Sequence, residues 1–204
     1  MVQNISLHMS LAHCFTLLRI FISPAFPILY LGYEWFGIPF QVLPYILLFL
    51  LCICESSDLI DGIVARRRNQ VTDLGKVLDP MADSITRISL FFTFTQGPIA
   101  LPLMIVLVFF YRDFFISTLR TLCALRGVAL AARFSGKVKA VIQAIVLFTI
   151  LLLMIPYSLG TLSLSLLQTI SAFATGISAL YTVISAGDYI FANRSYIKKA
   201  LELS

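Results

Sequence analysis

Residues 58–83 read DLIDGIVARRRNQVTDLGKVLDPMAD, and four of the five aspartates in this segment, Asp58, Asp61, Asp79 and Asp83, decide how the chain is interpreted. Asp58 and Asp61 are three residues apart, and Asp79 and Asp83 are four apart, so each pair shares one face of a helix. The basic loop between the pairs is short enough to make the two helices antiparallel neighbours. Both carboxylate pairs can therefore face each other near one end of two adjacent helices.

Four carboxylates that meet in one place repel each other, by about 4 kcal/mol for each close pair at an effective dielectric of 20. A positive charge must offset this repulsion, and a site of oxygen ligands selects hard cations such as Mg²⁺, Mn²⁺ or Ca²⁺. Neither His8 nor His13 belongs to the segment, which argues against zinc. The sequence therefore predicts a site for divalent metal.

Small residues and one arginine accompany the aspartates. Gly62 follows Asp61 directly, and Ala65 lies one helical turn further on, so a flat base or ribose could approach this helix closely. Arg66 could reach a phosphate or a base edge, and Gly75 would allow close packing of the two helices. The alternative is that both glycines serve helix packing alone.

The composition indicates a membrane protein. Of 204 residues, 59% are hydrophobic and 12% are charged, whereas about 25% of a typical soluble domain is charged. The four cysteines lie in apolar runs and are expected to be packing residues. The net charge of +5 fits membrane topology and anionic headgroups better than nucleic acid, which we do not expect as a partner.

Apolar stretches of about 20 residues predict an all-α integral membrane fold, a bundle of six transmembrane helices. They lie near residues 14–33, 44–65, 75–96, 99–124, 138–157 and 161–192. A short N-terminal interfacial helix is expected over residues 1–13. Residues 1–204 are expected to form a single domain.

The loops between these stretches differ in charge. The basic loops and ends carry Arg66, Arg67, Arg68, Lys76, Arg126, Arg133, Lys137, Lys139, Arg194, Lys198 and Lys199. The loops near 34–43, 97–98 and 157–160 contain no Lys or Arg. Because basic loops face the cytoplasm, we expect a multi-pass protein of the cell (inner) membrane. Both termini and the aspartate site would lie on the cytoplasmic side.

Written with its spacing, the segment is Asp58-x2-Asp61-Gly62-x2-Ala65-Arg66-x8-Gly75-x3-Asp79-x3-Asp83. This pattern resembles the complete signature of the CDP-alcohol phosphatidyltransferase family. The resemblance implies a six-helix membrane fold, usually a homodimer, with two divalent cations, Mg²⁺ or Mn²⁺, held by the four aspartates. It also implies a CDP-diacylglycerol donor bound by Asp58, Asp61, Gly62, Ala65, Arg66, Gly75 and Asp79, and it makes Asp83 the general base.

Downstream segments narrow the resemblance to phosphatidylglycerophosphate synthases within that family. The stretch from Tyr111 to Arg120 resembles their Arg-Glu-Phe…Leu-Arg segment, and the likeness continues through Gly127, Ala131, Ala132, residues 136–139 and Gln143. Thr16 and Arg19 resemble the family's Thr-x-x-Arg in the first helix. Two positions depart from the pattern: His13 replaces an Asn that is common there, and Asp113 replaces the usual Glu.

The resemblance implies transfer of a phosphatidyl group from CDP-diacylglycerol to glycerol 3-phosphate, giving phosphatidylglycerol phosphate and CMP. Inositol phosphate, serine, or phosphatidylglycerol as in a cardiolipin synthase are alternative acceptors on the same fold. A divalent-cation carrier is the alternative from a different class, but it gives no reason for Gly62, Ala65 and Arg66.

Glycerol 3-phosphate needs fixed cations for its phosphate. The candidates are Arg112, Arg120, Lys137 and Lys139. The alternative role for Arg112 and Arg120 is ion pairing, for example with Asp113 or Asp188. Arg19 could serve the site or anchor the first helix, and Thr16 is a further candidate beside it.

Overall fold

The computed structural model describes residues 19–67, 73–125, 127, 130 and 133–202, without the side chains of residues 58–67, 73–80 and 199–202. These residues form helices and connecting turns, and no strand occurs among them, as the sequence predicts. The helices are α2 (Ala25–Gly32), α3 (Leu43–Arg67), α4 (Asp73–Thr93), α5 (Leu103–Leu125), α6 (Phe134–Ser158) and α7 (Leu164–Glu202).

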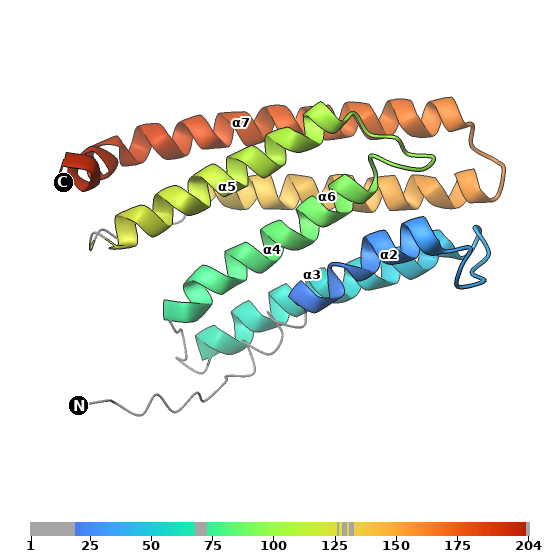
Figure 1. Ribbon diagram of the computed structural model, residues 1–204, viewed down its shortest axis with the longest axis horizontal. Helices are drawn as coiled ribbons and strands as arrows, with labels where there is room; N and C mark the ends of the chain where they lie inside the picture. Colours follow the sequence, from blue (N-terminus) through green and yellow to red (C-terminus); the bar gives the residue numbers. More distant parts are fainter. Residues whose placement is uncertain (1–18, 68–72, 126, 128–129, 131–132, 203–204) are drawn as a thin grey trace.

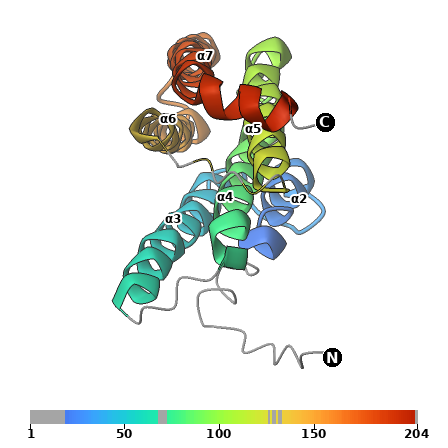
Figure 2. The same ribbon diagram turned by 90° about the vertical axis from the view of Figure 1, so that its left-hand side faces the viewer.

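The helices form an elongated bundle in which α4 occupies the middle (Figures 1 and 2). On one side α7 runs along both α6 and α5, and on the other side lie α2 and α3. Helix α4 contacts α2, α5 and α6. Helix α4, which carries Asp83, is therefore packed against helices from both sides of the bundle.

Aliphatic and aromatic side chains from α3, α4, α5 and α6 fill the core, for example Leu47, Phe91, Phe109 and Leu147. The rings of Phe91 and Phe109 lie 4.5 Å apart between their centroids. Large apolar side chains also cover the outside: Phe173 of α7 is 72% exposed. An apolar exterior over an apolar core is what a lipid environment favours.

The loop between α4 and α5 is fixed to α2. The hydroxyl of Tyr30 donates to the carbonyl of Gln96 at 3.1 Å, and Gly97 beside it has a φ of 68°. A Cβ atom at this glycine would lie 2.8 Å from the Tyr30 hydroxyl. Both the backbone conformation and the close approach therefore require glycine at position 97.

Two of the described helices, α6 and α7, are long and apolar enough to cross a membrane. Segments Arg19–Gly32 and Leu43–Ser57 are shorter apolar helices. Each of the six predicted spans corresponds to a helix in the same order, although the part of the first span before residue 19, and the interfacial helix over 1–13, lie outside the described residues. Helix α7 has 39 residues and continues ten residues past the predicted end at 192.

Candidate functional site

Asp83 on α4 is half-buried and forms an ion pair with Arg19. Arg19 is only 3% exposed and lies in the short helical segment that precedes α2. About one turn further along both segments, the hydroxyls of Ser23 and Thr86 lie 2.7 Å apart. The sequence left two roles open for Arg19, serving the site or anchoring the first helix. The guanidinium of Arg19 contacts the candidate site directly, and it also fixes the first helical segment against α4.

A second ion pair joins α4 to α3. The Nε atom of Arg87 lies 3.5 Å from Oε1 of Glu55, so the two helices are neighbours at this level, as the short loop between them predicts. Sequence reasoning gave neither residue a role. The available signal was helical spacing: Arg87 follows Asp83 by four residues, and Glu55 precedes Asp58 by three.

The other residues of the aspartate motif can be placed only by their helix. Asp58, Asp61, Gly62, Ala65 and Arg66 fall within α3, and Gly75 and Asp79 fall within α4. Their side chains, and Thr16 as a whole, lie outside the residues that the structure describes.

Asp113 on α5 is the centre of a buried polar cluster. Its Oδ1 accepts hydrogen bonds from Lys139 Nζ at 2.6 Å and from Arg112 Nη1 at 3.0 Å. Its Oδ2 accepts from Lys139 Nζ at 2.8 Å and from Ser84 Oγ at 2.9 Å. The structure thus brings together two of the four proposed acceptor-binding cations. Ser84, which directly follows Asp83 in the sequence, joins this cluster to α4.

Arg112 connects this cluster to α7 and α6. Its Nη2 donates to Ser185 Oγ at 3.1 Å, and a Cβ at Gly136 would lie 3.9 Å from the same nitrogen. Among the described residues, the buried Nε of Arg112 meets no hydrogen-bond partner. The ion pairing that the sequence allowed for Arg112 does occur, with Asp113, yet the side chain keeps a donor for another group.

The remaining two acceptor candidates lie apart from Asp113. Arg120 donates from Nε to the Tyr189 hydroxyl at 3.1 Å and stacks over that ring at 5.1 Å. Lys137 is exposed near the start of α6. Asp188 receives two hydrogen bonds from Arg133, at 2.9 and 3.1 Å, and one from Ser135. Arg120 therefore contacts an aromatic partner, Tyr189, in place of Asp188.

Two cations of the Asp113 cluster share one carboxylate. Arg112 and Lys139 both pair with Asp113, and no second carboxylate among the described side chains forms an ion pair with either of them. Because these groups are largely buried, water screens the remaining positive charge less than it would at a surface. This cluster can attract an anion.

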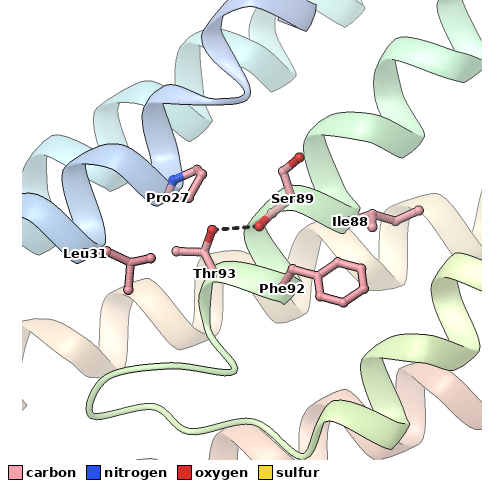
Figure 3. A pocket seen from close by; sticks show the side chains of 6 residues that line it. All are labelled: Pro27, Leu31, Ile88, Ser89, Phe92 and Thr93. Atoms are coloured by element: carbon pink, nitrogen blue, oxygen red, sulfur yellow. Dashed lines mark hydrogen bonds between the residues drawn. The ribbon is translucent and has the colours of Figure 1, made fainter.

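A shallow apolar hollow of about 310 Å³ lies between α2 and α4 (Figure 3). Pro27 and Leu31 line it from α2, and Ile88, Ser89, Phe92 and Thr93 line it from α4. The Thr93 hydroxyl donates to the Ser89 carbonyl at 2.7 Å, so it is already satisfied. No titratable group lines the hollow, whereas ion pairs gather around Asp83 and Asp113, which we take as the candidate site.

The model of the CDP-alcohol phosphatidyltransferase family matches residues 9–186. A protein of Bacillus subtilis (strain 168) named "CDP-diacylglycerol--glycerol-3-phosphate 3-phosphatidyltransferase" is 31% identical over 191 residues, which cover 90% of this chain and 94% of the relative. A Treponema pallidum (strain Nichols) protein of the same name is 31% identical over 153 residues, covering 71% and 69%. The Salmonella typhimurium relative of that name is 31% identical over 138 residues, covering 65% and 71%.

Proposed function

The chain belongs to the CDP-alcohol phosphatidyltransferase family, and we propose that it transfers the phosphatidyl group of CDP-diacylglycerol to glycerol 3-phosphate. The products are phosphatidylglycerol phosphate and CMP. The observation that carries the choice of acceptor is the cluster beside Asp83, where Arg112 and Lys139 share the single carboxylate of Asp113. An excess cation suits an acceptor that brings its own phosphate. The relatives named for this reaction support the same choice.

We infer that Asp58, Asp61, Asp79 and Asp83 hold two divalent cations, Mg²⁺ or Mn²⁺. The ion pair between Glu55 and Arg87 supports this set, because it fixes the register of α3 against α4. In antiparallel helices, moving one turn along each from this pair brings position 58 level with 83, and a second turn brings position 61 near the level of 79. All four residues are carboxylates, which suit hard cations. When bound, the cations would polarise the donor phosphorus and neutralise the charge of the departing CMP.

Asp83 is proposed as the general base. It accepts the proton of the acceptor hydroxyl while the hydroxyl oxygen forms a bond to the phosphorus that bears the diacylglycerol. The bond from that phosphorus to the CMP oxygen breaks in the same transfer. Arg19 orients the Asp83 carboxylate from the opposite helical segment. The donor's cytidine is proposed to lie along α3, near Gly62, Ala65 and Arg66.

Replacing Arg112 or Lys139 with Ala should raise the KM for glycerol 3-phosphate by roughly 10- to 150-fold, because a charge-assisted hydrogen bond contributes about 1.5–3 kcal/mol. The KM for CDP-diacylglycerol should change little. Initial rates of CMP release at varied acceptor and donor concentrations measure both constants. Lys198→Ala removes an exposed lysine of α7 and serves as the control. An unchanged acceptor KM in both Arg112→Ala and Lys139→Ala would remove the basic pocket from the proposal.

We propose that the protein crosses the cell membrane six times, acts there as a homodimer, and has both termini and the site on the cytoplasmic side. In a background without native cysteines, Gln41→Cys should react with an impermeant maleimide on intact cells. Ser195→Cys should react only after the cells are opened. Both positions are exposed, so accessibility within the protein is matched. The reverse pattern would place the site away from the cytosolic nucleotide and overturn this orientation.

A further inference from the structure

The carboxylate of Asp113 has no acceptor capacity left. A carboxylate offers about four lone-pair positions, and each oxygen of Asp113 already accepts two hydrogen bonds, from Lys139, Arg112 and Ser84. The residue is only 8% exposed. A metal ion or a proton would have to displace one of these donors, so Asp113 suits neither metal binding nor proton transfer.

The donors to Asp113 come from different helices. Ser84 belongs to α4, Arg112 to α5 and Lys139 to α6, and Arg112 continues the connection to Ser185 of α7. Arg112 and Lys139 are both cations, so without a carboxylate between them they would repel each other in a region of low dielectric. Asp113 therefore determines the positions of these two side-chain cations relative to α4 and to Asp83.

We propose that Asp113 is a positioning residue that fixes Arg112 and Lys139 in the geometry that receives the acceptor's phosphate. This inference rests on the proposed function. The acceptor's phosphate is bound by donors that Asp113 leaves unused, among them the Nε atom of Arg112, and the carboxylate itself does not contact the acceptor. Ser84 completes the arrangement by joining Asp113 to the helix that carries Asp83.

Two explanations of acceptor binding can be compared: attraction by the net charge of the cluster, and positioning of its cations by Asp113. They predict opposite effects of Asp113→Asn on the acceptor KM. The variant raises the charge of the cluster by one unit, so attraction alone would lower the KM for an anionic acceptor. Positioning predicts the reverse, because the amide cannot hold both cations and they move apart. Ser84→Ala changes no charge, so attraction predicts no effect, whereas positioning predicts a higher acceptor KM.

The experiment measures KM and kcat for both substrates with purified variants in detergent, together with their thermal stability. We expect Asp113→Asn to raise the KM for glycerol 3-phosphate about 10-fold or more, and Ser84→Ala to raise it roughly 3- to 10-fold. The KM for CDP-diacylglycerol should stay unchanged. Asp113→Glu keeps the charge and should recover most of the acceptor KM.

Asp188→Asn is the matched control, because Asp188 also joins α7 to the start of α6 through charged hydrogen bonds but does not contact Arg112 or Lys139. It should leave both KM values unchanged. An acceptor KM that is unchanged or lower in folded Asp113→Asn, or unchanged in Ser84→Ala, would overturn the inference. If Asp113→Asn does not fold, Ser84→Ala alone decides. Wild-type protein that makes no phosphatidylglycerol phosphate would contradict the proposed function instead.

Discussion

Asp83→Asn should lower kcat by roughly 10²–10⁴-fold, the usual effect of losing a general base. Asn has nearly the same shape as Asp, and its carbonyl oxygen can still accept a hydrogen bond from Arg19, the ion-pair partner of Asp83. The amide, however, cannot take a proton from the acceptor hydroxyl. The binding of CDP-diacylglycerol should persist, since α3 supplies most of the proposed nucleotide contacts. Single-turnover CMP release, with donor binding measured separately, resolves the two effects.

The same variant also distinguishes a base from a metal ligand. Titration of Asp83→Asn with Mn²⁺ should restore little activity if Asp83 acts mainly as the base. Recovery of the wild-type rate at high Mn²⁺ would assign it a ligand role alone. Asp188→Asn, which removes a carboxylate paired with Arg133 away from α4, should keep the wild-type kcat. A normal turnover of Asp83→Asn without added metal would refute the base assignment.

Removal of divalent metal should abolish activity completely, and Mg²⁺ or Mn²⁺ should restore it. The four aspartates of the motif offer only oxygen ligands, and without cations they would repel one another at close range. The measurement is CMP release after treatment with EDTA, followed by addition of each metal in excess. A parallel thermal-unfolding curve tests whether the protein stays folded during the treatment. Full activity of folded protein in metal-free buffer would exclude the proposed two-metal site.

Much of the fold follows from patterns that are local in the sequence. Apolar runs of spanning length predict six helices in the correct order, and the short loop after Arg67 predicts that α3 and α4 are neighbours. The predicted ends of the helices are less accurate than their order. Helix α7 continues to Glu202 because its last turns contain good helix formers such as Lys198 and Ala200, whereas hydropathy only detects the apolar part that ends earlier.

The sequence also predicts only part of the candidate site. Helical spacing groups the aspartates on two faces, and an intramembrane arginine such as Arg112 is a functional candidate because its burial costs free energy. Spacing cannot say which distant residue a side chain meets. The pairs Arg19–Asp83 and Lys139–Asp113 join positions 64 and 26 residues apart. Such contacts depend on how the helices pack, so Asp113 was recognised from the sequence only as an unusual residue and a pairing partner.

One measurement tests the central proposal most directly. Purified protein with Mg²⁺ or Mn²⁺ and CDP-diacylglycerol is offered glycerol 3-phosphate, inositol phosphate, serine or phosphatidylglycerol in separate reactions. The lipid product is identified by mass spectrometry, and CMP is quantified. We expect phosphatidylglycerol phosphate and one CMP per lipid formed with glycerol 3-phosphate, and little turnover with the others. Faster turnover of another acceptor would contradict the assigned substrate, and the absence of CMP release with every acceptor would contradict the transferase activity itself.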